Sequence, residues 1–291
     1  NNFRGRGQTV GVSGSYSKYS KSVEASFTEP SLFDRNVSAG IDIYRRDYDS
    51  FNYFRSSRKT TYQQSTTGFQ LRAGVPLTEY FTAVARYTLN FDDISLDRST
   101  FFTDRVTPGV QQCDPLLAGR YLCEAIGKRT SSIVGMSLIY DTLDNRQRPT
   151  RGSMATLNGD FAGLGGSVKF ARLRGNAARY WPMGAGFVFS LQGEGGAIKA
   201  LDHSGDKAAG IDDVRLTDRF YLGEPQIRGF DIRGIGPRVL RIPYIDSNGD
   251  GTLDSLSTDR KQFTDDALGG KYYYMGRAEL EIPLGSGARE L

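Results

Sequence analysis

The sequence predicts an all-β protein, specifically an antiparallel up-and-down β-barrel that crosses a membrane. Long segments alternate between apolar and polar residues, which is the period of a β-strand. Their connections alternate between short and long, as in a barrel with one turn end and one loop end. Glycine, tyrosine and phenylalanine are abundant (35, 16 and 17 of 291 residues), whereas there are 2 cysteines. This composition fits the same class of protein.

The clearest strand is predicted at Tyr80–Phe91. Every odd position from 81 to 91 is apolar or aromatic, whereas the even positions include Arg86, Thr88 and Asn90. A strand of about ten residues is long enough to cross a bilayer at a tilt. We expect the odd positions to face lipid and the even positions to face the lumen of the barrel.

The same alternation recurs along the chain and predicts about ten strands. The other regular strands are expected near residues 23–28, 36–43, 69–75, 134–140, 187–194 and 272–282, and two less regular, glycine-rich and arginine-rich strands near 153–162 and 168–181. No segment has a convincing helical period.

The connections between these strands differ at the two ends. Each short or middling connection contains a proline, which ends strand pairing because it lacks an N–H; these prolines are Pro30, Pro76, Pro149, Pro182 and Pro283. At the other end we expect long loops near 46–65, 92–130 and 197–269 and tight ones near 16–21 and 163–167. In an outer-membrane barrel the long loops are extracellular and the short turns are periplasmic.

Composition excludes several other classes of protein. The mean hydropathy is −0.44, and no run of 18 apolar residues predicts a transmembrane helix. A barrel is compatible with this value because its lipid-facing and lumen-facing residues alternate. The net charge is +4, with 37 basic residues scattered among 33 acidic ones, so no nucleic-acid-binding patch is indicated.

A soluble β-sandwich is the alternative fold. It would also alternate, but its strands would be nearer five or six residues long. Here the strands are long and aromatic residues gather at their ends, for example Tyr80, Tyr140 and Tyr180. That placement is typical of the aromatic girdles of a membrane barrel.

The two cysteines, Cys113 and Cys123, lie in the same predicted loop. An extracellular loop matures in an oxidising space, so we predict a disulfide between them. It would close a short loop and contribute about 2–3 kcal/mol. Metal binding is disfavoured because no histidine is nearby.

A segment near residue 250 resembles the start of a calcium-binding loop. Asp246, Asn248 and Asp250 occupy positions one, three and five of the EF-hand spacing, with glycine at position six and Asp254 following. Position twelve is Ser257 rather than a bidentate glutamate. The segment is therefore either a polar surface loop or a weak, structural calcium site.

No catalytic constellation is apparent. His203 is the one histidine of the sequence and falls in a predicted loop. No serine–histidine–aspartate group or histidine metal site can be built on it. We therefore expect neither an enzyme nor any cofactor beyond weakly bound calcium.

Three segments carry a family resemblance. Phe220–Phe230, which reads Phe-Tyr-Leu-Gly-Glu-Pro-Gln-Ile-Arg-Gly-Phe and is followed by Gly236-Pro237, resembles the (V/I)RG(F/Y) loop of the BamA family of outer-membrane assembly proteins. Tyr140–Gly152 resembles the periplasmic turn of that family, and Gly269–Pro283 resembles the strand after the loop. The resemblance extends over nearly the whole chain. TamA and the two-partner secretion transporters share the arginine loop but fit its flanks less well.

The resemblance implies that residues 1–291 are one partial barrel domain. The family has a sixteen-stranded barrel preceded by POTRA domains, of which this chain would hold strands three to twelve. The loop at 197–269 would fold into the lumen, led by the motif Ile227, Arg228, Gly229 and Phe230. Arg228 would pair with a carboxylate on the lumen face of the following strand, Glu281 rather than Glu279. A charge-assisted pair of this kind would hold the loop inside the barrel.

The resemblance also implies a function. The chain would belong to an insertase that folds and inserts β-barrel proteins into the bacterial outer membrane, without ATP or a cofactor. Its partners would be the lipid bilayer, unfolded outer-membrane proteins and accessory assembly lipoproteins. A two-partner-secretion-type or TamA-like protein translocation barrel is the alternative, and a passive porin is a third class.

Overall fold

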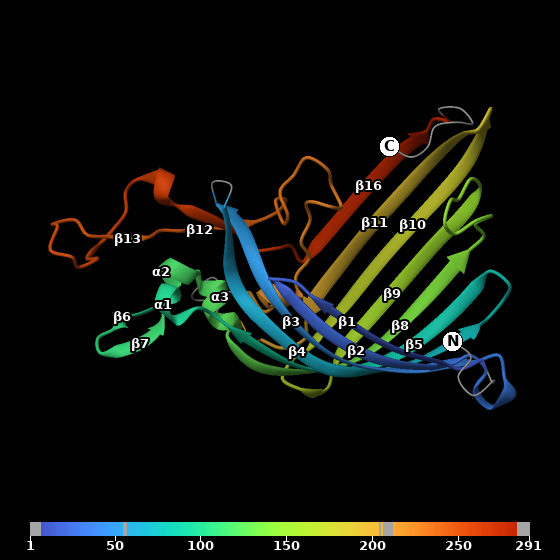
Figure 1. The fold of residues 1–291 in the computed structure, drawn as a ribbon, viewed down its shortest axis with the longest axis horizontal. Coiled ribbons are helices and arrows are strands. Elements are labelled where there is room, and N and C mark those ends of the chain that lie inside the picture. Colours follow the sequence, from blue (N-terminus) through green and yellow to red (C-terminus); the bar gives the residue numbers. More distant parts are fainter. Residues whose placement is uncertain (1–6, 55–56, 204, 206–211, 284–291) are drawn as a thin grey trace.

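The computed structural model describes residues 7–54, 57–203, 205 and 212–283, and ten strands of that part form one antiparallel sheet (Figure 1). The strands are β1 (Thr9–Tyr16), β2 (Ser20–Glu29), β3 (Ser38–Phe54), β4 (Ser57–Pro76), β5 (Phe81–Ser95), β8 (Gly127–Asp141), β9 (Gly152–Gly166), β10 (Phe170–Gly184), β11 (Phe187–Ala200) and β16 (Tyr272–Glu281). They pair in chain order, β1-β2-β3-β4-β5-β8-β9-β10-β11-β16. The predicted number of strands and their up-and-down order are confirmed.

The sheet curves into a deep trough, as Figure 1 shows. Within the described residues β1 and β16 are its two edges, and each pairs with one neighbour. Short connections join the strands at one end of the trough, at 30–37, 77–80, 142–151 and 185–186. The connections at the other end include the longest two, 96–126 and 201–271. We call these the turn end and the loop end.

One predicted loop, 46–65, is largely strand. β3 and β4 remain paired from Ser38 with Gly74 to Phe54 with Ser57, with one irregularity at Ser50 and Phe51. The hairpin therefore continues beyond its neighbours at the loop end (Figure 1). The loop prediction was wrong because the run of polar residues at 55–61 interrupts the alternation in the sequence, whereas the backbone ladder needs no burial to persist.

The 96–126 connection contains short helices that the sequence analysis did not expect. Its elements are α1 (Arg98–Phe101), β6 (Phe102–Thr107), β7 (Val110–Cys113), α2 (Pro115–Ala118) and α3 (Arg120–Ala125). Asp97 caps α1 and Asp114 caps α2 by accepting a backbone N–H of the first turn. Helices of one or two turns are too short to show a helical period, so their caps were the available signal.

The 201–271 connection has two parts. Its described residues from 212 onward include a 3-10 turn, η2 (Leu216–Asp218), and pack on the sheet through Val214 and Leu216. It continues into an arm that projects from the loop end (Figure 1). The arm comprises β12 (Arg238–Arg241) paired with β15 (Thr264–Ala267), β13 (Tyr244–Ile245) paired with β14 (Ser255–Leu256), and a 3-10 turn, η3 (Arg260–Gln262). Within the described residues no helix is both long and apolar enough to span a membrane.

The two faces of the sheet are unlike those of a soluble sandwich. One face exposes apolar side chains along the middle of the strands: Ile41, Ile43, Leu71, Phe81, Phe91, Val134, Met136, Leu138, Leu157, Phe161, Leu173 and Leu191. The other face buries polar groups: Asp42, Thr88, Asp92, Ser137, Asp160 and Ser190. In β5 the apolar odd positions lie on the first face and the polar even positions on the second, as predicted. Apolar outside and polar inside is the pattern of a membrane barrel wall.

The larger hydrophobic core lies at the loop end. It joins Ile94 and Leu96 at the end of β5 to Phe101 and Leu122 of the 96–126 connection and to Leu216 of the 201–271 connection. The two long connections therefore pack on each other. A further contact is the backbone hydrogen bond from Ile242 N to Leu116 O, 3.3 Å long.

Candidate functional site: the polar wall and the loop that crosses it

Asp160 of β9 is the centre of a charged cluster on the polar face. Its side chain is 4% exposed, and it accepts hydrogen bonds from Arg86 of β5 and from Arg172 of β10, whose Nε lies 3.1 Å away. Arg86 also donates to Ser137 of β8, 2.5 Å away. The cluster therefore ties four consecutive strands together through charge-assisted bonds.

A glycine leaves room for the Arg86 side chain to cross β8 and contact Asp160. Gly135 of β8 lies in register between Arg86 and Asp160. A Cβ atom at position 135 would lie 2.5 Å from the Arg86 Nε and 2.8 Å from the Asp160 Oδ1. Because glycine has no side chain, the arginine can pass over β8 to a strand that is not its neighbour.

The same arrangement occurs nearer the β1 edge. Arg72 of β4 donates to Asp42 of β3 at 2.7 Å and to Thr28 of β2 at 2.8 Å. Its side chain passes over Gly40, where a Cβ would lie 2.6 Å from the Arg72 Nε. Two glycine-bridged arginines thus stiffen the polar face at separate places.

Between these charges the polar face is hollowed. A cavity of about 500 Å³ is lined by both signs of charge, including Arg172, Arg174 and Glu194. Tyr273 of β16 donates its hydroxyl hydrogen to Glu194 at 2.5 Å. The hollow is a polar, water-compatible surface, and its lining holds neither a histidine nor a cysteine.

The predicted arginine motif lies at an exposed turn. The Ile227 N–H donates to the Gly223 carbonyl at 2.9 Å, and Gly229 has a φ of +86°. The side chains of Arg228 and Phe230 are exposed. The turn is attached to β16 by Arg277, which donates to the Gln226 carbonyl oxygen at 2.9 Å.

The predicted contact between Arg228 and Glu281 is not made in this structure. Glu281 instead accepts from Arg148 of the 142–151 turn, whose Nε is 3.2 Å away. Glu279 lies 3.8 Å from Arg277. Within the described part of the chain Arg228 forms no ion pair.

The reason is the depth that the loop reaches. Gln226 meets β16 at the level of Arg277, whereas Glu281 is the last residue of the strand, at the turn end. Four residues of a strand span about 13 Å. The local motif gave no information about this depth.

A second arginine of the same loop reaches the sheet. Arg233 donates through Nη1 to the Ser50 Oγ of β3 at 2.5 Å, and its guanidinium carbon lies 3.9 Å from the centre of the Tyr221 ring. Arg233 also has a φ of +59°, which is strained for a residue other than glycine. Burial raises the pKa of the Tyr221 hydroxyl, which donates to the Leu216 carbonyl.

Sequence reasoning missed Arg233, although a signal was present. The tripeptide Ile-Arg-Gly occurs twice, at 227–229 and at 232–234. Both arginines precede a glycine and so stand at points where the backbone can turn. The tertiary path of the loop decides which of the two arginines meets a strand.

The start of the loop is fixed by a buried charged triad. Arg129 of β8, with a side chain 5% exposed, donates from both terminal nitrogens to Asp218 of η2 at 2.9 and 3.0 Å and from Nε to Asp92 of β5 at 3.3 Å. The bidentate geometry fixes orientation as well as distance. Arg129 therefore anchors the loop to the sheet at η2, close to the place where Val214 packs against Phe170 and Ile198.

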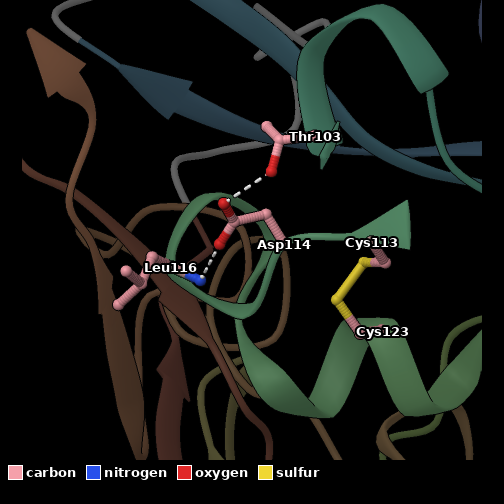
Figure 2. The surroundings of a disulfide bond; sticks show 5 residues. All are labelled: Thr103, Cys113, Asp114, Leu116 and Cys123. Carbon is pink, nitrogen blue, oxygen red and sulfur yellow. Dashed lines mark hydrogen bonds between the residues drawn. A yellow bond between two sulfur atoms is a disulfide. The ribbon is translucent and has the colours of Figure 1, made fainter. Parts of the chain in front are cut away.

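The predicted disulfide is present. Cys113 at the end of β7 is bonded to Cys123 in α3, with an S–S distance of 2.01 Å (Figure 2). Figure 2 also shows the buried Asp114 between two partners, the Leu116 N–H at 2.8 Å and the Thr103 hydroxyl at 3.0 Å. The 96–126 connection is thus closed by a covalent bond beside a helix cap.

The calcium prediction gains no support from the geometry of its residues. Asp246 accepts from the backbone N–H groups of its own turn, including Gly251 at 2.8 Å, and Asp250 accepts from Thr252 at 2.7 Å. Asp254 accepts from Ser247. The hydrogen bond from Gly251 helps to hold the pKa of Asp246 below its usual value. In the described residues no group of three or more histidine, cysteine or acidic side chains could hold a metal.

Comparisons with known proteins agree with this architecture. The chain is 26% identical over 243 residues to the outer membrane protein assembly factor BamA of Nitratidesulfovibrio vulgaris and 26% identical over 259 residues to that of Neorickettsia risticii. These alignments cover 81% and 89% of this chain. A SAM50-like protein of Drosophila melanogaster is 25% identical over 83% of the chain.

A solved structure shares the fold. The crystal structure of BamA from Haemophilus ducreyi lacking POTRA domains 1–3 matches all of this chain and 50% of that one, with a TM-score of 0.71 and 21% identity. The chain spans 26% and 28% of the length of the two BamA relatives and 49% of the SAM50-like protein. The resemblance to BamA proteins that the motifs indicated is confirmed. Residues 2–290 match the model of the Omp85 superfamily domain, and the chain therefore belongs to the Omp85 superfamily.

Proposed function

We propose that this chain is the barrel wall of an outer-membrane protein that folds and inserts other β-barrel proteins. The observation that carries the proposal is the sheet of a member of the Omp85 superfamily whose outer face exposes apolar residues and whose inner face buries charged ones. The printed names of its BamA relatives, outer membrane protein assembly factor, point to the same activity.

In this proposal the sheet is integral to the bacterial outer membrane. The loop end is extracellular and the turn end is periplasmic. Residues 1–291 form a partial barrel domain, and part of the loop predicted at 197–269 occupies the lumen. Unfolded outer-membrane proteins and accessory assembly lipoproteins are the partners, and no nucleic acid is involved. Any bound calcium would be weak and structural.

The proposed insertion forms and breaks no covalent bond. A strand entering lipid must satisfy every backbone N–H and C=O, so pairing with an existing strand lowers the cost of inserting backbone groups that would otherwise be unpaired. No ATP or cofactor enters such a step. The role of the Asp160 cluster and of the Arg129 triad is to keep the wall and the loop in fixed positions while a substrate strand pairs elsewhere.

Arg228 keeps a role in this proposal. Its exposed guanidinium is free to meet a carboxylate in the whole protein, with Glu281 or Glu279 as the proposed partner. Meeting Glu281 would require the loop to move toward the turn end and Arg148 to release the carboxylate. The pairing is therefore a proposal about a second position of the loop.

The test is insertion of a barrel substrate into vesicles. The whole protein, reconstituted in phospholipid vesicles, should accelerate the folding of an unfolded outer-membrane barrel. Folding is measured as the rate at which the substrate becomes resistant to protease. Vesicles that carry an unrelated porin are the control. The translocation alternative predicts instead that an unfolded soluble exoprotein crosses into the vesicles, and transport without accelerated insertion would replace the proposal.

A further inference from the structure

The apolar face contains a groove at the loop-end half of the sheet. Its volume is about 530 Å³, within the range of roughly 300–1,000 Å³ that is ordinary for small-molecule sites. Met136, Gly159, Leu173, Ala197 and Tyr272 lie side by side in it, one from each of five consecutive strands. The row is therefore a continuous, shallow apolar strip across the sheet, which we call the channel.

Gly159 makes the floor of this channel. It lies between Met136 and Leu173 in the strand register. A Cβ added to it would meet one atom within 4 Å, the Leu173 Cδ1 at 4.0 Å. The space above the glycine is open because no side chain fills it.

Lys199 stands above the channel on the apolar face, and strand alternation continued one residue before β10 places Lys169 on that face as well. Lys199 lines the groove and lies two residues beyond Ala197 in β11. Its partner in β10 is Ala171, and Lys169 lies two residues before that partner. Both are exposed, and Val168, Phe170 and Ile198 beside them are buried. Neither forms an ion pair within the described ranges. The long lysine stems can lie along apolar surface while the ammonium groups reach water.

We propose that this groove binds a phosphorylated, net-anionic membrane lipid. One acyl chain fills the channel over Gly159, and Lys199 and Lys169 hold the phosphate. The inference rests on the proposed membrane placement, in which this face meets lipid and the lysines lie at the interface. Tyr272, 71% exposed at the rim, stands at the same level, as aromatic residues of an interfacial belt do. Basic residues at an interface attract anionic head groups.

The test is lipid titration by native mass spectrometry of the whole protein, delipidated in mild detergent. The wild type should retain one phosphatidylglycerol in preference to phosphatidylcholine. The double variant Lys169→Gln/Lys199→Gln should bind it about ten- to thirtyfold more weakly, since each interfacial lysine contributes of order fivefold. Gly159→Val should weaken both lipids because it fills the channel. Lys128→Gln, a basic residue of β8 outside the groove lining, is the matched control and should bind like wild type.

Several results would overturn the inference. Binding by the double variant within twofold of wild type would do so, and so would an equal loss in the Lys128→Gln control, which would indicate diffuse surface charge. Displacement of the lipid by excess inorganic phosphate would show that the channel is not used. Lipid binding is measured without a protein substrate. Failed binding alongside normal insertion would therefore contradict this inference alone, and normal binding alongside absent insertion would contradict the proposed function alone.

Discussion

Arg233 of the 201–271 connection donates a hydrogen bond to Ser50 of β3 across 183 positions of the sequence. The connection leaves the sheet at β11, beside the β16 edge, whereas β3 lies near the β1 edge. The loop therefore crosses the trough and ties one wall to the other. The Tyr221 ring under the Arg233 guanidinium supports this crossing from within the loop.

Replacing Arg233 should release the loop. Arg233→Ala removes the bond to Ser50 and the contact with Tyr221, and a hydrogen bond to a charged group contributes about 1.5–3 kcal/mol. Limited proteolysis of the whole protein should then cut faster between residues 219 and 241. Arg228→Ala is the comparison and should have a smaller effect, since Arg228 is exposed and lacks an ion pair in the described residues at this position of the loop. Faster cutting in Arg228→Ala, with Arg233→Ala protected, would reverse the roles of the two arginines.

Filling the gap at Gly135 should weaken the wall. Gly135→Ala places a Cβ 2.5 Å from the Arg86 Nε, so the arginine must leave Asp160. Asp160 keeps its bonds to Arg172, so the cost should stay below the roughly 3–5 kcal/mol that leaving a buried charge without any partner would bring. The temperature at which the barrel loses its compact mobility on a detergent gel should fall. Gly193→Ala, at a glycine whose added Cβ meets nothing within 4 Å, should leave that temperature unchanged.

Removing the disulfide should act locally. Cys113→Ser with Cys123→Ser reopens a short loop and should cost about 2–3 kcal/mol in the 96–126 connection. Hydrogen exchange should rise in α2 and α3 while the strands stay protected. Non-reducing peptide mapping of the wild type should recover the bridged peptide. Two free thiols in protein taken from the outer membrane would contradict the assignment.

The turn at 142–151 should lose order only in strong acid. Asp144 accepts from the Thr150 hydroxyl and from the backbone N–H groups of Arg151 and Thr150, which hold the pKa of this carboxyl well below its usual value. A depressed folded pKa stabilises the turn above the unfolded value of about 3.9. That contribution is lost as pH falls through the folded pKa. Exchange at Thr150 and Arg151, corrected for the intrinsic rate, should therefore rise below about pH 4. Asp144→Asn should remove this pH dependence, and an unchanged profile in the variant would refute the assignment.

The strands and their faces were predictable because lipid and water impose opposite demands on alternate residues. The alternation in β5 alone placed Arg86 and Thr88 on the polar face, where both form hydrogen bonds. Pro30 and Pro149 lie in short connections as predicted, whereas Pro76 and Pro182 lie in the last residues of β4 and β10 and keep strand partners. The β3–β4 hairpin was missed because the run of polar residues at 55–61 interrupts the alternation in the sequence.

The long-range contacts could not be predicted from local sequence. Nothing near Gly135 indicates that an arginine passes over it, because that arginine lies 49 positions earlier in the chain. The family motif directed attention to Arg228, and the repeated Ile-Arg-Gly tripeptide offers no means of ranking Arg233 above it. Both outcomes depend on how far the loop descends along the polar face.

Cysteine accessibility across β5 is the most direct test of the account, because both proposals require the apolar face to meet lipid. Ala85→Cys and Asn90→Cys should be compared in the whole protein in outer membranes, using a thiol reagent that is soluble in water but does not cross lipid. Asn90 is half-buried and lines the polar hollow. We expect the cysteine at position 90 to react and the cysteine at position 85 to stay unmodified. Reaction at position 85 with protection at position 90 would place the apolar face in water and contradict the account.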